Sequence, residues 1–294
     1  MKEIRRDFLK YIDLHVHSDI SDGTLTPREV VELACNCNLS AIALTDHDTL
    51  DGIYEAQETV DNLAKQGKEI RLIPGIEITV GYKDRDIHVL GLFLDPYNTN
   101  LLKGLEAIRE KRNLRNEKMI NNLVNAGIDI SVEALRREEG DAVLTRAHFA
   151  KHLVAHGYTK NKKEAFRKYL GSDTPYYVKR QYLTPENGID LIHEAGGLAI
   201  LAHPLLYKYN LNEIDSLIQY LHQFGLDGIE AIYSMNTGYD ESNMLRICNK
   251  YKLAISGGSD FHGENKPDIK LGTGLGNLKV PYSVLENLEI KRKK

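Results

Sequence analysis

Cysteine is scarce in this chain of 294 residues, tryptophan is absent, and no apolar run approaches the length of a membrane span. The three cysteines, Cys35, Cys37 and Cys248, are too few and too unevenly spaced for a disulfide framework, which excludes the small cross-linked secreted domains. Cys35 and Cys37 lie in a helical pattern and lack the second pair that a zinc site needs, so we interpret them as structural. The N-terminal residues are charged and no apolar segment follows them, so we expect no signal peptide, no membrane association and a cytoplasmic protein.

An excess of positive charge is also missing. The formal net charge is −4 and charged residues make up 27% of the chain, so the overall charge does not attract nucleic acid. An anionic substrate must therefore be held by local charge or by metal ions. The length is sufficient for one large α/β barrel or for two modest domains.

Short apolar strand patterns alternate with helical patterns along most of the chain. We expect strands at 11–16, 41–45, 70–73, 76–80, 87–94, 198–202, 228–233 and 253–256, and barrel helices at 27–38, 51–66, 185–195, 211–224 and 240–251. Only Pro74-Gly75 separates the third strand from the fourth. Between residues 100 and 180 the alternation stops, and the chain is nearly all helical and highly charged. Roughly seven strands of βα type predict a parallel barrel made by residues 1–99 and 181–294, interrupted by a helical insertion at 100–180.

Histidine and carboxylate residues gather near the ends of the expected strands, where barrel enzymes place their chemistry. Nine of them are candidate metal ligands: His15, His17, Asp22, His47, Glu77, His88, His203, Asp260 and His262. Imidazole and carboxylate ligands without thiolate favour Mn²⁺, Fe²⁺ or Zn²⁺. Because nine ligands exceed what one tetrahedral ion needs, we expect two or three divalent ions.

The clearest signal is the pair His15 and His17. Residues two apart on a strand leave the same face, so both imidazoles can grip one cation. A lone histidine in an apolar strand is more often a core residue, and this alternative stays open for His88. Glu77 also stands in an apolar strand, where an unpaired carboxylate is costly, and bridging two cations would provide its partner.

The segment Asp46-His47-Asp48 follows the second expected strand and can turn only one or two of its side chains toward a metal. We choose His47 as the ligand and expect Asp46 or Asp48 to orient a ligand by a hydrogen bond without binding the metal itself. Asp48 is alternatively the N-cap of the next helix. Glu230, at the end of another strand, is left undecided.

A multi-metal site of this kind serves hydrolysis, because it activates a water molecule and clamps the oxygens of an in-line displacement. A phosphate ester is the natural substrate, and His203, His262 or a metal-bound water is the candidate proton donor to the leaving group. Arg146 lies in a less charged stretch of the insertion and can offer a bidentate fork to a phosphate. The other basic residues there, including Arg112 and Arg115, are interleaved with glutamates and predict an ordinary solvated helix face.

The order HxH…D…TDH…GIE…H…AHP…SDFH resembles the PHP (polymerase and histidinol phosphatase) superfamily over essentially the whole chain. The resemblance implies a distorted (β/α)7 TIM-like barrel with an inserted helical cap domain and a trinuclear metal site. It implies one metal bound by His15, His17, Glu77 and Asp260, a second held by Glu77, His88 and His203, and a third held by Asp22, His47 and His262.

The insertion resembles the same superfamily in the segment Leu144-Thr145-Arg146-Ala147-His148, where members usually read Arg-Pro-His and use the arginine on substrate phosphate. The resemblance therefore implies Arg146 and His148 as substrate-binding residues. Lys179 and Arg180 are added as candidate phosphate contacts.

The members that this chain most resembles imply two activities. One is hydrolysis of a nucleoside 3′,5′-bisphosphate to the 5′-phosphate, and the other is 5′→3′ exoribonuclease action on a short RNA 5′ end. Two alternatives are a histidinol-phosphate phosphatase and, from a different class, a non-catalytic metal-binding PHP module. We expect no obligate protein partner.

Overall fold

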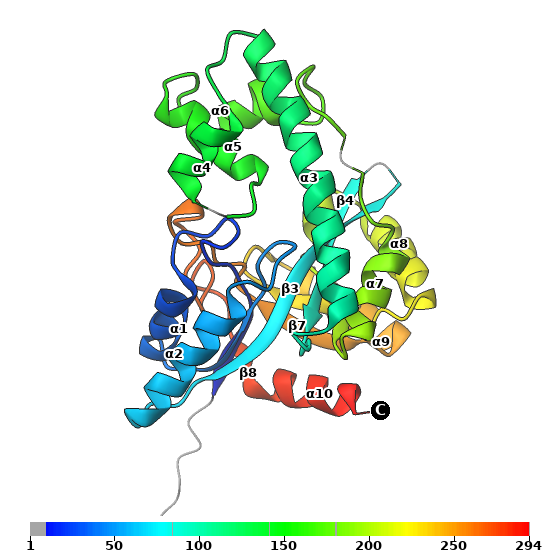
Figure 1. Ribbon diagram of the computed structural model, residues 1–294. Coiled ribbons are helices and arrows are strands. Elements are labelled where there is room, and N and C mark those ends of the chain that lie inside the picture. Colours follow the sequence, from blue (N-terminus) through cyan, green and yellow to red (C-terminus); the bar gives the residue numbers. More distant parts are fainter. Residues whose placement is uncertain (1–9, 84, 141, 180, 294) are drawn as a thin grey trace, which may run out of the picture.

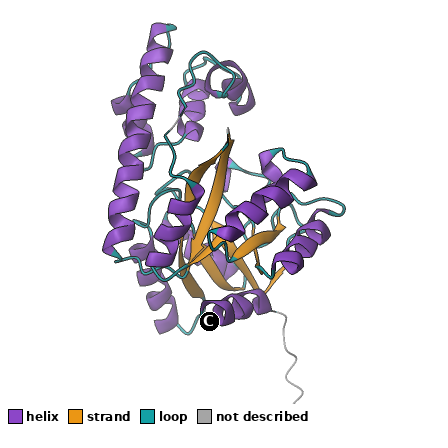
Figure 2. Cartoon of the chain, turned by 90° about the vertical axis from the view of Figure 1, so that its right-hand side faces the viewer, coloured by secondary structure: helices purple, strands orange, loops and turns teal. Residues whose placement is uncertain are grey.

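The computed structural model describes residues 10–83, 85–140, 142–179 and 181–293. Its eight-stranded sheet has the order β7-β6-β5-β4-β3-β2-β1-β8 and curls into a nearly closed barrel with helices around it (Figures 1 and 2). The strands are β1 (Tyr11–Val16), β2 (Leu39–Leu44), β3 (Arg71–Tyr82), β4 (Arg85–Leu92), β5 (Leu198–Leu201), β6 (Gly228–Tyr233), β7 (Ala254–Gly258) and β8 (Val280–Pro281).

The barrel closes between β1 and the segment that follows β7. The N–H of His17 donates to the carbonyl of Phe261 over 3.0 Å, and the N–H of Asp260 donates to the carbonyl of His15 over 2.9 Å. Gly258 permits this approach, because a Cβ there would lie 2.5 Å from the Cβ of His15. The two segments richest in candidate ligands are therefore held side by side.

The expected all-parallel arrangement is wrong at β4, and the short strand β8, which was not expected, also pairs antiparallel with β1. β1 to β3 are parallel, and so are β5 to β7, but β4 is antiparallel to both β3 and β5. The physical reason is the short connection from Tyr82 to Arg85, since a parallel crossover needs about a dozen residues or more. β3 is also one continuous strand: Pro74 lacks a donor but fits extended backbone, and its carbonyl accepts from the N–H of Leu94 over 3.1 Å.

Helices cover the outside of the barrel as the periodicity predicts. They are α1 (Pro27–Asn36), α2 (Ile53–Lys65), α7 (Pro185–Glu194), α8 (Leu211–Gln223), α9 (Asp240–Tyr251) and α10 (Tyr282–Arg292), with short 3₁₀ turns η2 (Pro204–Tyr207) and η3 (Gly263–Asn265). α10 was not expected from the sequence, and Lys291 and Arg292 lie in its last turn. Val284, Leu285 and Leu288 bury one face of it against the barrel, which explains its stability.

The segment after β4 is helical. It contains α3 (Thr99–Asn125), α4 (Val132–Glu139), α5 (Arg146–Ala155), α6 (Lys162–Ala165) and the π-helix η1 (Phe166–Leu170). The N-terminal half of α3 packs on α7, where Gly104 lies against Leu191. The C-terminal half packs with α4, α5 and η1 around a separate apolar cluster that includes Met119, Leu123 and Phe149.

These helices stand over one end of the barrel, with α4, α5 and α6 above the loops in Figure 1. The N–H of Val143 donates to the carbonyl of Ile20 over 3.0 Å, and Lys162 Nζ donates to Asn265 Oδ1 over 2.7 Å. The loops that follow β1 and β7 thus anchor the helical segment above the strand ends. None of the helices in the described ranges is both long and apolar enough to cross a membrane.

Candidate metal centre

The fold brings the nine candidate ligands together at the barrel end that faces the helical segment. His15 is near the end of β1, and the residues that follow strand ends directly or within a short loop are His17, Asp22, His47, His203, Asp260 and His262. These seven lie where parallel strands of a barrel present side chains at the rim. All of them are buried except His47, which is partly exposed.

Glu77 and His88 lie inside strands rather than near strand ends. β3 and β4 extend beyond the rim as a hairpin, so the middle of these two strands is level with the ends of the others (Figure 1). The N–H of Glu77 donates to the carbonyl of Asp46 over 3.2 Å, and the N–H of Asp48 donates to the carbonyl of Glu77 over 3.1 Å. These bonds fix Glu77 beside the segment that carries His47.

The Glu77 carboxylate is the centre of the cluster. Oε1 lies 2.7 Å from His88 Nδ1 and 2.9 Å from His203 Nε2. Oε2 lies 3.1 Å from His47 Nδ1, 3.2 Å from His17 Nε2 and 3.4 Å from His15 Nε2. Each oxygen therefore faces a different set of imidazoles, which is the arrangement that a bridging carboxylate requires.

Asp22 and Asp260 face the histidines from two other sides. Asp22 Oδ1 lies 3.3 Å from His262 Nε2 and 3.8 Å from His47 Nε2. Asp260 Oδ1 lies 3.5 Å from His17 Nε2. The ligand atoms of three overlapping groups lie within 4.8 Å of one another: His15, His17 and Glu77; His47, Glu77 and His88; and His17, Asp22, His47 and His262. His17 and His47 are each shared by two groups, so the division of the nine residues among individual ions stays a prediction.

The pattern of ring nitrogens fits cations at this place. His15 Nδ1 lies 3.0 Å from Glu230 Oε1, which assigns a proton to Nδ1 and leaves Nε2 facing His17 Nε2 at 3.1 Å. Within the described residues, the buried Nδ1 atoms of His17 and His203 have no hydrogen-bond partner. A divalent cation between the Nε2 atoms of His15 and His17 would satisfy lone pairs that otherwise face one another.

The surroundings of His15 and His17 shift the pKa values of the two imidazoles in opposite directions. Burial disfavours a charge on His15, but the carboxylates of Glu230, Glu77 and Asp260 outweigh burial and raise its pKa well above the usual range. Burial lowers the pKa of His17 well below the usual range, and the neighbouring His262 lowers it further. His17 is therefore held neutral, which is the form that binds metal.

The carboxylates are held ionised. Burial would raise the pKa of Glu77, but His88, His47 and His15 outweigh it and keep that pKa well below its usual range. For Asp260, burial is likewise outweighed, first by Lys266, whose Nζ lies 2.6 Å from Oδ2, and the pKa falls well below its usual range. Ionised carboxylates beside imidazoles form a donor set typical of a hydrolytic metal site.

Glu230, which the sequence left undecided, orients two of the candidate ligands. It accepts from His15 Nδ1 over 3.0 Å and from the backbone N–H of His203 over 2.8 Å. Its position at the inner face of β6 therefore sets the ring of His15 and the turn at His203 together. Partners of this kind fix the tautomer and direction of a ligating histidine.

Asp46 and Asp48 have separate roles. Asp46 accepts from the N–H and the hydroxyl of Ser18 and from the hydroxyl of Ser21, so it shapes the loop after β1, and burial raises its pKa to about 6. Asp48 pairs with Arg112 and accepts from the N–H of Thr79. The alternative that Asp48 caps the next helix is wrong, because Gly52 is the N-cap of α2.

Three site residues adopt backbone conformations that cost energy. Asp48, His203 and Asp260 have positive φ angles of 54°, 26° and 58°, in the region that residues other than glycine rarely adopt. Such conformations persist where the surroundings hold them and are concentrated at functional sites. Here the surroundings include the hydrogen bonds of Glu230 to His203 and of Asp260 to the carbonyl of His15.

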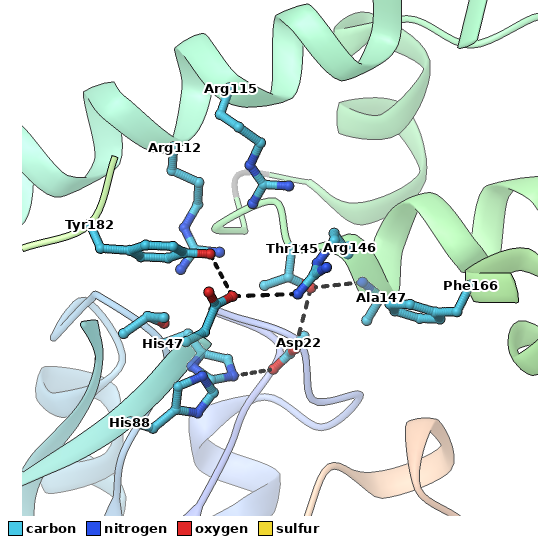
Figure 3. Close-up of a pocket in the computed structure, with 12 residues that line it drawn as sticks. Asp22, His47, His88, Arg112, Arg115, Thr145, Arg146, Ala147, Phe166 and Tyr182 are labelled. Atoms are coloured by element: carbon cyan, nitrogen blue, oxygen red, sulfur yellow. Dashed lines mark hydrogen bonds and ion pairs between the residues drawn. The ribbon is translucent and has the colours of Figure 1, made fainter. Parts of the chain in front are cut away.

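A cavity of about 190 Å³ lies between the metal cluster and the helical segment. Figure 3 shows Asp22, His47 and His88 on one side of it and Arg112 and Arg115 projecting toward them from α3. The remaining wall is formed by Thr79, Asp86, Thr145, Arg146, Ala147, Phe166 and Tyr182. The cavity thus joins a candidate metal centre to a cluster of guanidinium groups.

Arg112 and Arg115 correct the sequence interpretation, which assigned them to a solvated helix face. They are only 5% and 7% exposed and line the cavity. The signal that would have found them is their spacing, because they continue the buried stripe of α3 that runs through Leu101, Leu105, Ile108, Arg112, Arg115, Met119 and Leu123. Arginines that replace apolar residues in such a stripe face the interior rather than solvent.

Arg146 is the first residue of α5 and reaches into the cavity (Figure 3). Its guanidinium lies 5.9 Å from the ring of Phe166 and 5.4 Å from the ring of Tyr177, and Nη2 is 3.6 Å from Asp86 Oδ2. The neighbouring hydroxyl of Thr145 donates to Asp22 Oδ2 over 3.3 Å. The start of α5 is thereby tied to a candidate metal ligand.

The other expected substrate contacts lie elsewhere. His148 is buried, and its Nδ1 accepts from the N–H of Thr145 to cap α5, so its role in substrate binding stays a prediction. Lys179 is exposed, and Arg180 lies outside the described residues. Tyr182 also lines the cavity and donates to Asp86 Oδ2 over 2.5 Å.

Comparisons with known proteins agree with this geometry. The family model described as PHP domain matches residues 13–260. The chain is 33% identical over 263 residues to the 5'-3' exoribonuclease Rnm of Escherichia coli (strain K12), covering 90% of this chain and 88% of the relative. It is 37% identical over 261 residues to the 3',5'-nucleoside bisphosphate phosphatase of Chromobacterium violaceum, covering 88% of this chain and 90% of that one.

A solved structure from Bifidobacterium adolescentis, provisionally described as a metal-dependent phosphoesterase, covers 96% of both chains with a TM-score of 0.84 and 28% identity. The family model spans most of the chain, and the curated relatives match it over about nine tenths of its length. The chain therefore belongs to the PHP family of metal-dependent phosphoesterases, and it is a phosphoric ester hydrolase.

Proposed function

We propose that this enzyme hydrolyses a phosphate ester at the end of a small nucleotide or a short RNA. The reaction would convert a nucleoside 3′,5′-bisphosphate to the 5′-phosphate, release nucleotides from an RNA 5′ end, or do both. The observation that carries the proposal is the guanidinium cluster of Arg112, Arg115 and Arg146 around a cavity that borders candidate metal ligands. One phosphate near the metals would not need this additional charge, whereas a substrate with a second phosphate would.

We further propose that residues 1–99 and 181–294 act as the barrel and that residues 100–180 act as its cap. The nine ligands would hold two or three ions of Mn²⁺, Fe²⁺ or Zn²⁺, and bound ions of this kind lower the pKa of water and neutralise phosphate charge. Arg146 and the two arginines of α3 would hold phosphate oxygens. The three free cysteines support a reducing compartment such as the cytoplasm.

The residues around the candidate ligands orient those ligands and determine which of their nitrogen atoms carry protons. Glu230 holds His15 and His203, and Lys266 and the hydroxyl of Tyr233 hold the outer oxygen of Asp260, at 2.6 and 2.9 Å. His203 and His262 stay our candidate catalytic histidines. His262 Nδ1 lies 2.8 Å from the carbonyl of Asp260 and so carries a proton there, which leaves Nε2 as the atom that faces Asp22.

The size of the cavity favours recognition of a phosphorylated end. Its volume of about 190 Å³ is smaller than the 300 Å³ or more that a typical small-molecule site encloses. A terminal phosphate and part of a ribose would fit, while the base and any following nucleotides would extend beyond the cavity, whose wall offers Tyr182 as a stacking surface. Both proposed substrates share such an end, so the cavity supports one chemistry on either.

A product analysis tests the proposal. Mn²⁺-loaded protein is incubated with adenosine 3′,5′-bisphosphate and separately with a 5′-phosphorylated RNA pentamer, and the products are separated by ion-exchange chromatography. We expect adenosine 5′-phosphate with orthophosphate from the first, stepwise mononucleotides from the second, or both. An Asp260→Asn preparation should release neither. Failure of the wild-type enzyme on both substrates, with turnover of histidinol phosphate, would overturn the nucleotide assignment.

A further inference from the structure

A second cluster of metal-binding side chains lies in the helical segment, outside the cavity. His152 and His156 are four residues apart at the C-terminal end of α5, and Glu138 reaches them from α4. Their ligand atoms lie within 4.8 Å of one another, as in the groups at the barrel rim. His152 and His156 follow Arg146 by six and ten residues, so this cluster lies roughly 9 to 15 Å along the helix from Arg146.

The hydrogen bonds of His152 leave one of its nitrogens facing negative charge. Its Nε2 lies 2.9 Å from the backbone carbonyl of Asp129, and since a carbonyl only accepts, Nε2 carries the proton. Its Nδ1 lies 2.9 and 3.1 Å from the two oxygens of Glu138. In the neutral ring, Nδ1 would present a lone pair to a carboxylate, and this contact is repulsive unless a positive charge lies between them.

His156 repeats the arrangement from the exposed side. Its Nε2 lies 3.0 Å from Glu138 Oε1, the same oxygen that faces His152, and the two imidazole rings are 4.1 Å apart. Two nitrogens therefore converge on one carboxylate oxygen. In tetrahedral coordination, zinc ligands stand about 3.3 Å apart, so each contact would need to open by only a few tenths of an ångström to admit an ion.

The spacing and the outer bonds are those of a built site. Histidines at positions i and i+4 present their rings on one face of a helix and chelate a single ion. His152 is buried, and its Nε2–H bond to the carbonyl of Asp129 fixes the ring and its tautomer, as a bond behind a ligating histidine does. Two imidazoles and one carboxylate favour Zn²⁺, and next Co²⁺, Ni²⁺ or Cu²⁺, over Mg²⁺ or Ca²⁺.

We propose that Glu138, His152 and His156 bind one divalent cation of the zinc type, with water completing its coordination. The ion would join α4 to the end of α5 and, through His152, to the chain at Asp129 that leads into α4. Its role would be structural, because it would fix the helices from which Arg146 and Thr145 reach the cavity. This site is separate from the barrel cluster and stands whether or not the proposed substrates are correct.

The test counts bound zinc. Full-length protein without an affinity tag is dialysed against micromolar Zn²⁺ at a pH where free histidine is neutral, freed of loose metal by gel filtration, and analysed for zinc per chain. His156→Gln and Glu138→Gln are the test variants, since both side chains are exposed and their replacement leaves the buried His152 in place. His222→Gln, which changes an exposed helical histidine on α8, is the matched control.

Each test variant should bind one zinc ion fewer than the wild type, and the control should bind the same number as the wild type. Equal zinc content in all four proteins would overturn the proposal and assign the contacts to a protonated His152 paired with Glu138. A second readout is tryptic cleavage at Arg136 and Arg137 beside Glu138. Zinc should slow this cleavage in the wild type and in His222→Gln, and it should not do so in His156→Gln.

Discussion

The barrel rim and the helical segment above it build the same cavity in different ways. At the rim, nearly every functional side chain is held by several others, and Glu77 alone contacts five histidines. On the helical side, Arg112 is buried and pairs with the carboxylate of Asp48, and Arg146 lies 3.6 Å from Asp86 and keeps 29% of its side chain exposed. The difference indicates a rigid centre for the chemistry and an adaptable wall for the part of the substrate that does not react.

The two sides also differ in their support. The rim residues lie in the strands of the barrel sheet or in the short segments after them, and three site residues there hold costly positive φ angles. The arginines project from α3 and α5, which pack around a separate apolar cluster. A change at the rim should therefore affect the rate of reaction, and a change on the helical side should mainly affect substrate affinity.

The largest effect is expected for Asp260→Asn. The variant removes an ionised oxygen that faces His17 and His15. Loss of a residue that only supports a metal ligand costs up to about 100-fold, so for Asp260 itself we expect kcat to fall by more than that. The folded state should persist by circular dichroism. Asp268→Asn, at an exposed carboxylate nearby, is the control. Full activity in Asp260→Asn would contradict the assignment of the rim as the reactive side.

A smaller effect is expected for Glu230→Gln, because Glu230 orients His15 and His203 without facing the cavity. The amide keeps the shape but changes what it offers to His15 Nδ1, and loss of such a partner typically costs about 10- to 100-fold in metal affinity or activity. The measurement is activity against metal concentration. A curve shifted to higher metal is the expected result; an unshifted curve would leave Glu230 as a purely structural residue.

A still smaller and different effect is expected for Arg115→Met. Hydrogen bonds to charged groups are worth about 1.5–3 kcal/mol, so KM should rise roughly tenfold or more while kcat changes little. Methionine replaces the buried stem, although it loses the hydrogen bond that Arg115 Nη1 donates to Met119 Sδ. Arg109→Met serves as the control, since Arg109 is on the same helix but pairs with Asp51 at the surface. Equal KM values for the Arg115→Met and Arg109→Met variants would contradict a role of Arg115 in substrate binding.

Much of the rim was predictable from the sequence because its signals are local. His15 and His17 share a strand face, and His47, His203 and Asp260 each lie within three residues of the end of a strand. The direction of β4 was missed because periodicity does not report direction, although the short connection from Tyr82 to Arg85 requires a hairpin. The position of Glu77 and His88 inside their strands follows from the same hairpin.

The helical side was predicted less well because its signals depend on tertiary contacts. The helical character of the segment after β4 was predicted correctly, yet Arg112 and Arg115 were assigned to solvent. Their burial depends on α3 crossing from the barrel to the cavity, and neighbouring glutamates conceal the apolar stripe in the sequence. The sequence did not reveal the cluster that contains Glu138 and His156 for the same reason, since its members come from different helices.

The most direct test of this division uses two substrates and one pair of variants. Values of kcat/KM are measured for adenosine 3′,5′-bisphosphate and adenosine 3′-phosphate with wild type, Arg146→Met and the surface control Arg109→Met. If Arg146 holds the phosphate that does not react, its replacement should reduce kcat/KM roughly tenfold or more for the bisphosphate only. Equal losses on both substrates would contradict the account and place Arg146 at the reacting phosphate together with the metal residues.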